Sequence, residues 1–216
     1  MRPFDYVLAP SAEAAIASAV GVEGVAFIAG GTDLMQLMKE GAAAPSRLVD
    51  VNPLPCTEIT IGPQGLRIGA LARMSDVADD PGVRERFPVI AQALLASASA
   101  QVRNMASIGG NLLQRTRCTY FRDPAMPCNK RAPGTGCSAQ GGDNRLHAIF
   151  GGSTHCVATH PSDLAVALVA LDAVVLVQGP AGERRIAIGD FHSQPGDAPE
   201  RDTVLEPGEL ILAVEV

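Results

Sequence analysis

Four cysteines lie in one stretch of the sequence that has almost no regular hydrophobic pattern. Cys118, Cys128, Cys137 and Cys156 follow the spacing C-x9-C-x8-C-x18-C, whereas Cys56 stands alone. Thiolates are ligands for zinc and for iron–sulfur clusters. The N-terminus lacks the apolar segment of a signal peptide, and clustered cysteines without such a signal favour metal or cluster binding over disulfides.

The spacing of these cysteines does not by itself decide what they bind. Structural zinc sites usually take their ligands from close C-x2–4-C pairs, so the wide spacing argues mildly against zinc. A cluster tolerates wide spacing because its ligands radiate from a larger inorganic core. A zinc site and two disulfides remain as alternatives. Residues from about 114 to 160 are rich in proline, glycine and arginine, and an ordered loop of this length is uncommon and usually functional.

Two glycine pairs are the second feature that could do chemistry. Gly30-Gly31 lies in FIAGGTDL and Gly109-Gly110 lies in ASIGGNL. Glycine permits positive φ and lets the backbone approach a phosphate without a Cβ in the way, and neighbouring N–H groups in such a turn form an anion-binding nest. Neither pair belongs to a Rossmann fingerprint or a P-loop. Ordinary tight turns are the alternative for both.

Small polar side chains accompany both glycine pairs. Thr32, Ser107 and Asn111 could hydrogen-bond to a phosphate or to sugar hydroxyls. Asp33 cannot lie directly on a pyrophosphate because like charges repel. We expect its carboxylate to meet a ribose or ribityl hydroxyl, or a helix N-terminus.

The first glycine pair is predicted to lie in a small α/β lobe, residues 1–54. The apolar run Val25–Ala29 indicates a buried strand, the residues after the glycines have helical spacing, and Arg47–Val51 indicates a second strand. Asn52-Pro53 ends this unit. Strand, glycine turn and helix together offer free backbone N–H groups to a phosphate.

Residues 55–216 are predicted to form a larger lobe with a mixed sheet. Its expected elements are a hairpin at Ile59–Ile61 and Leu66–Ala70, helices at Pro88–Ser97 and Asp163–Leu171, a strand at Ala173–Gln178 and a last strand in ELILAVEV. The fold class is therefore α+β in two lobes, with a cleft between them as the natural ligand site. Because the sequence stops inside an apolar strand, we expect a C-terminal portion to be missing.

Composition excludes several classes of function. The formal net charge is −6 and basic residues do not gather along an identifiable face, which disfavours nucleic-acid binding. No apolar run approaches the roughly 20 residues of a membrane span. The sequence alone indicates a cytoplasmic protein, or a periplasmic one if a signal-bearing partner carries it out.

The motifs resemble those of the FAD-binding (medium) subunits of the molybdenum hydroxylases, the xanthine dehydrogenase family. FIAGGTDL and QVRNMASIGGN are similar to its two flavin motifs, HPSDLAVALVALDA to the segment that follows, and LEPGELILAVEV to the strand that ends the flavin domain. The resemblance runs through essentially the whole chain. It implies a two-lobed vanillyl-alcohol-oxidase/PCMH-like fold that binds FAD, followed in family members by a C-terminal domain that is absent here.

The insertion RCTYFRDPAMPCNKRAPGTGC narrows the resemblance. It is similar to the subgroup whose flavin subunit carries an extra [4Fe-4S] cluster, that of periplasmic aldehyde oxidoreductase. This resemblance implies that the four clustered cysteines bind the cluster in a loop at about 114–160. The flavin-contacting positions that it implies are Phe27, Ile28, Ala29, Gly30, Gly31, Thr32, Asp33, Leu34, Gln101, Ser107, Ile108, Gly109, Gly110, Asn111, Asp163 and Ile211.

The resemblance implies an electron-transfer role. A large partner subunit with a molybdenum cofactor would oxidise an aldehyde, a small partner with [2Fe-2S] clusters would pass the electrons on, and the flavin here would hand them to an acceptor. The assembly that the resemblance implies is a heterotrimer of these three subunits, or a dimer of such heterotrimers. The alternatives are a 4-hydroxybenzoyl-CoA reductase-like or xanthine/CO dehydrogenase-like enzyme, a stand-alone vanillyl-alcohol-oxidase-type oxidoreductase and a non-catalytic zinc-stabilised module. The sequence shows no Ser-His-Asp or paired-carboxylate arrangement that would indicate another catalytic mechanism.

Overall fold

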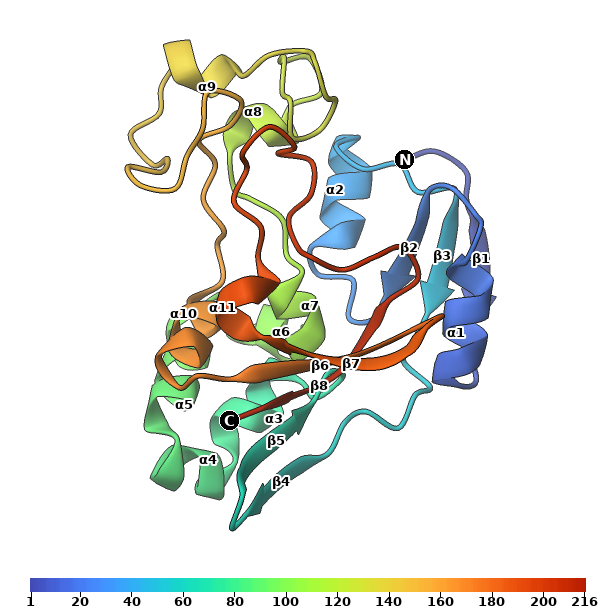
Figure 1. Cartoon of the computed structure of the whole chain (residues 1–216), viewed down its shortest axis with the longest axis vertical. Helices are drawn as coiled ribbons and strands as arrows, with labels where there is room; N and C mark the ends of the chain where they lie inside the picture. Colours follow the sequence, from blue (N-terminus) through green and yellow to red (C-terminus); the bar gives the residue numbers. More distant parts are fainter.

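The computed structural model describes residues 1–216 and divides its strands between two sheets (Figure 1). The first sheet is parallel, in the order β1 (Asp5–Leu8), β3 (Arg47–Asp50), β2 (Val25–Ile28). The crossovers carry α1 (Ala12–Ala19) and α2 (Leu34–Glu40). The predicted strand–turn–helix sequence around the first glycine pair is therefore observed.

The second sheet has five strands in the order β4-β5-β8-β6-β7. Their bounds are Ile59–Gly62, Gly65–Gly69, Leu210–Glu215, Val174–Gly179 and Gly182–Ala187 respectively. Every pair in this sheet is antiparallel. The expectation of a mixed sheet in the larger lobe is therefore wrong in detail. Parallel pairing is confined to the first sheet, where helical crossovers make it possible.

Helices pack against the five-stranded sheet and enclose the main core. They are α3 (Met74–Asp79), α4 (Pro81–Arg86), α5 (Pro88–Ala96), α7 (Ile108–Leu112), α10 (Asp163–Ala170) and α11 (Ile188–Phe191). The short helix α6 (Ala100–Arg103) contributes no buried residue. The core cluster contains 25 buried residues and is almost entirely aliphatic, as the absence of tryptophan requires. A smaller apolar cluster, which includes Val49 and Leu210, joins the first sheet to the second.

Neighbouring leucines of α5 test the assignment of this core. Leu94 is fully buried, whereas Leu95 is 45% exposed. We expect Leu94→Ala to lower the free energy of unfolding by about 2–5 kcal/mol, because the substitution removes buried methyl groups and leaves a cavity. Leu95→Ala is expected to change it by about 0.5 kcal/mol or less. Equal effects of the two substitutions in urea unfolding would contradict the packing of α5.

The cysteine-rich loop lies apart from both sheets, at one end of the molecule (Figure 1). Its only helices are α8 (Thr119–Arg122) and α9 (Ser138–Gly141), four residues each. Phe121 is 1% exposed and belongs to a small apolar cluster with Leu37 of α2. The base of the loop therefore has apolar anchorage, which the sequence analysis did not foresee.

None of the helices combines the length and hydropathy that crossing a membrane requires.

Candidate flavin site and cysteine-rich loop

A cavity of about 740 Å³ lies where the two glycine turns meet. This volume falls in the range of small-molecule and cofactor sites. Fourteen of the predicted flavin-contacting positions line the cavity: Phe27, Ile28, Ala29, Gly30, Gly31, Thr32, Asp33, Leu34, Ser107, Gly109, Gly110, Asn111, Asp163 and Ile211. Gln101 and Ile108 do not line it, because Gln101 is exposed on α6 and Ile108 is fully buried in the core.

The first glycine turn presents unpartnered backbone donors. None of the six N–H groups from Ala29 to Leu34 donates a hydrogen bond within the chain. Gly31 has φ of +69°, the left-handed region that favours glycine. A Cβ on Gly30 would lie 1.9 Å from the carbonyl oxygen of Met105, so only glycine permits this close approach. Consecutive free N–H groups on a cavity wall fit the pyrophosphate of a dinucleotide.

The second glycine turn is built differently from the anion nest expected of it. Ile108 N–H donates to Ala72 O at 3.0 Å, and Gly109 N–H donates to Ala70 O at 2.8 Å. Gly110 N–H donates to the hydroxyl of Ser107 at 3.2 Å. These bonds hold α7 against the residues that follow β5. The second turn therefore shapes the cavity instead of offering a row of free amides.

Asn111 connects the second turn to the start of α10. The hydroxyl of Ser162 donates to Asn111 Oδ1 at 2.6 Å and accepts the N–H of Ala165 at 2.9 Å, which caps the helix. The amide of Asn111 donates to Met74 Sδ at 3.4 Å. The expectation that Asn111 is free to bind a phosphate or sugar is therefore not met, since its side chain is 6% exposed and engaged on both ends.

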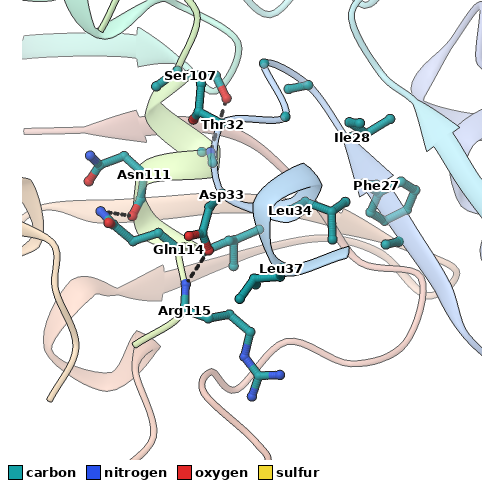
Figure 2. A pocket seen from close by; sticks show the side chains of 18 of the residues that line it. Phe27, Ile28, Thr32, Asp33, Leu34, Leu37, Ser107, Asn111, Gln114 and Arg115 are labelled. Carbon is teal, nitrogen blue, oxygen red and sulfur yellow. Dashed lines mark hydrogen bonds between the residues drawn. The ribbon is translucent and has the colours of Figure 1, made fainter. Parts of the chain in front are cut away.

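Asp33 binds arginines of the cysteine-rich loop, and Figure 2 shows its contact with Arg115. Its carboxylate accepts the backbone N–H of Arg115 at 2.8 Å, Arg117 Nη1 at 2.5 Å and Arg122 Nη2 at 2.8 Å. It does not cap α2. The two roles expected for this carboxylate, a sugar hydroxyl or a helix N-terminus, therefore do not match its contacts. Because its partners follow 82 to 89 residues later, no local signal identifies them.

The charge of Asp33 has a testable pH dependence. Burial is the largest influence and acts to raise its pKa, but the hydrogen bonds from Arg115, Arg117 and Arg122 together lower the pKa below the ordinary value of 3.8. A lowered folded-state pKa stabilises the protein above 3.8, and this contribution is lost as the pH falls through the folded value. We therefore expect the stability difference between wild type and Asp33→Asn to be larger at about pH 6 than at about pH 3. A constant difference in urea unfolding would contradict this assignment.

The cysteines of the loop are neighbours in space. Cys128 and Cys137 face each other across an isolated antiparallel bridge. Burial raises the pKa of the Cys118 thiol, and the charges of Cys128 and Cys137 raise it further. Burial also raises the pKa of the Cys156 thiol, and the charges of Cys137 and Cys128 raise it further. Cys118 packs against the small apolar cluster that contains Cys128. Asn129, next to Cys128, donates to the carbonyl of His155, next to Cys156, at 3.1 Å.

The four thiols have the donor type that iron–sulfur clusters bind. All five cysteines are free, so the alternative of two disulfides is not realised. No three His, Cys, Asp or Glu side chains are arranged to hold a metal ion. His147, which the sequence analysis did not single out, places Nε2 3.1 Å from the sulfur of Cys118.

The fold and the cavity define a class of protein. Residues 2–216 match the family described as the FAD binding domain in molybdopterin dehydrogenase, and the chain belongs to this family. It is 50% identical over 216 residues to the aldehyde oxidoreductase FAD-binding subunit PaoB of Escherichia coli K12, covering 99% of this chain and 68% of that protein.

More distant relatives agree with this placement. The chain is 29% identical to the 6-hydroxypseudooxynicotine dehydrogenase complex subunit alpha of Paenarthrobacter nicotinovorans, covering 100% of this chain and 58% of that subunit. The CO dehydrogenase of Oligotropha carboxidovorans has the same fold, with a TM-score of 0.71 and 24% identity over 100% of this chain and 60% of that one. The chain thus spans about three fifths of the length of these two proteins.

Proposed function

We propose that the chain is the FAD- and [4Fe-4S]-binding electron-transfer subunit of a molybdenum-cofactor aldehyde oxidoreductase. The observation that carries the FAD part is the row of unpartnered backbone N–H groups from Ala29 to Leu34 on the wall of the cavity. These neutral amides supply hydrogen-bond donors to an anion.

Several residues would hold the flavin cofactor. The amides of Ala29–Leu34 would bind the pyrophosphate, and Thr32 and Ser107, which line the same cavity, would bring hydroxyls to phosphate or sugar oxygens. The apolar lining, which includes Phe27 and Ile211, would exclude water from the ring system. When bound, the flavin supplies one-electron and two-electron chemistry, whereas the protein supplies position and electrostatics.

The cluster part of the proposal rests on the cysteine-rich loop. Cys118, Cys128, Cys137 and Cys156 would be the four thiolate ligands. They are free, Cys128 faces Cys137, and Cys128 lies beside the segments that carry Cys118 and Cys156. Lys130, which follows Cys128 by two residues and is only 8% exposed, would offset part of the thiolate charge.

The rest of the complex follows from the relatives. We infer that a large molybdenum-cofactor subunit oxidises the substrate and that a small subunit with [2Fe-2S] clusters passes electrons to the flavin site. The assignment of aldehydes rests on the 50% identity to PaoB, an aldehyde oxidoreductase subunit. Relatives at lower identity belong to dehydrogenases of glyceraldehyde, carbon monoxide and xanthine.

Comparing FAD with FMN tests the flavin part of this function. FMN lacks the pyrophosphate bridge and the adenosine half, so it cannot use the whole row of free amides. We expect FAD to bind one molecule per chain and at least about tenfold more tightly than FMN, equivalent to about 1.4 kcal/mol. Quenching of flavin fluorescence measures both affinities. Equal affinities for FAD and FMN would show that the first glycine turn is not the pyrophosphate site.

A further inference from the structure

The segment from Gln114 to Arg122 belongs to both proposed cofactor sites. Gln114, Arg115 and Arg117 line the flavin cavity. Arg117 also lines a second cavity, of about 440 Å³, together with Cys118. One short stretch of chain therefore forms a wall of the flavin site and carries a cysteine of the loop.

Asp33 ties this segment to the first glycine turn. Its three donors come from Arg115, Arg117 and Arg122, and the side chains of Asp33 and Arg122 are each only 15% exposed. An ion pair this sheltered from solvent is screened far less than a surface pair. Replacing Asp33 would leave the sheltered Arg122 charge with only Glu40 as its carboxylate partner.

Arg115 is fixed from its other side. Its guanidinium donates to Asp202 through Nε at 2.6 Å and lies 4.7 Å from the centre of the Phe121 ring. Asp202 also accepts from Lys130, close to Cys128. The cysteine-rich loop is thus held at its base by three carboxylates, those of Asp33, Glu40 and Asp202. Only Asp33 belongs to the turn whose amides face the flavin cavity.

We propose that Asp33 is a positioning residue that couples the two cofactor sites, an inference that rests on the proposed function. Cluster binding through Cys118 would order the segment from Arg115 to Arg122. The carboxylate of Asp33 would then hold the adjacent amides of Gly31 and Thr32 in the arrangement that binds pyrophosphate. Linkage is reciprocal, so FAD would stabilise the cluster by the same factor.

Charge supports this role. A lone carboxylate beside the amides of the turn would repel a pyrophosphate. The guanidiniums of Arg117 and Arg122 compensate Asp33, so the turn can accept an anion while the carboxylate remains in place. The same pairs draw the cysteine-rich loop toward the flavin turn.

A linkage experiment on the full chain tests the coupling. The FAD dissociation constant is measured anaerobically on protein reconstituted with Fe²⁺ and sulfide and on the same protein without reconstitution, with iron counted in both. The ratio of the two constants is compared among wild type, Asp33→Asn and Glu40→Gln. Glu40 is the matched control, because it accepts from the other Arg122 nitrogen at 3.1 Å but does not line the flavin cavity.

We expect the cluster to tighten FAD binding at least about fivefold in wild type. The ratio should fall to near one in Asp33→Asn and stay at the wild-type value in Glu40→Gln. A merely structural role would weaken FAD with and without the cluster by the same factor and leave the ratio unchanged. Arg117→Gln removes one donor to Asp33, and the Arg117 side chain is 53% exposed. We expect this variant to lower the ratio partly. It takes the place of Asp33→Asn if Asp33→Asn does not fold.

An unchanged ratio in the Asp33 or Arg117 variant, or a wild-type ratio of one, overturns the coupling while the proposed function stands. Wild-type protein that takes up no iron or no FAD is a different failure. It refutes the proposed function, and the coupling falls with it.

Discussion

Replacing Cys128 by serine is expected to remove the iron–sulfur cluster altogether. Cys128 is buried, faces Cys137 and lies beside the segments that carry the other two cysteines of the loop. Its loss therefore takes away a central ligand, and a serine hydroxyl is a poor substitute for a soft thiolate. Iron and acid-labile sulfide, counted per chain after anaerobic purification, should fall from about four each to near zero.

Cys56→Ser is the matched control for this substitution. Cys56 packs beside the cluster of apolar residues that joins the two sheets, away from the cysteine-rich loop. We expect it to retain full iron and sulfide. Equal iron in wild type and Cys128→Ser, or equal loss in both serine variants, would show that the four-cysteine site is wrongly assigned.

Gly30→Ala is expected to impair FAD binding severely. The new Cβ would lie 1.9 Å from the carbonyl oxygen of Met105 and 2.7 Å from its carbonyl carbon. Both neighbours are backbone atoms, so the turn itself must move and its free amides move with it. Overpacking of this kind costs about 1–3 kcal/mol, which corresponds to a loss of about fivefold to 150-fold in FAD affinity if the whole cost falls on the bound state.

Gly189→Ala controls for the mere loss of a glycine. Gly189 lies in α11, has no positive φ and has no heavy atom within 4 Å of an added Cβ. Titration with FAD should give the wild-type affinity for this variant. An unchanged affinity in Gly30→Ala would mean that the first turn does not position the cofactor.

Local signals predicted much of the fold. The predicted helix at Asp163–Leu171 is α10, and the side chain of Ser162, directly before it, accepts the N–H of Ala165 as a cap. The hairpin of β4 and β5 lies within about a residue of its predicted bounds. Such features depend on a few neighbouring residues, so sequence alone contains them.

Features that depend on distant contacts could not be predicted. The two glycine turns look alike in sequence, yet only the first has a row of free amides, because Ala72, Ala70 and the Ser107 hydroxyl accept those of Ile108, Gly109 and Gly110 in the second. The partners of Asp33 lie more than 80 residues away. Gln101 and Ile108 belong to a matching motif but lie outside the cavity lining, since a motif does not reveal which of its side chains turn toward the ligand.

The visible absorption spectrum of anaerobically purified protein, before and after dithionite, tests the central claim most directly. Twin flavin bands over a broad shoulder, both bleached by dithionite, with one FAD and about four irons per chain, are the predicted result. A featureless spectrum from protein that contains zinc instead of iron would contradict the assignment of the chain as a flavin and iron–sulfur electron-transfer subunit.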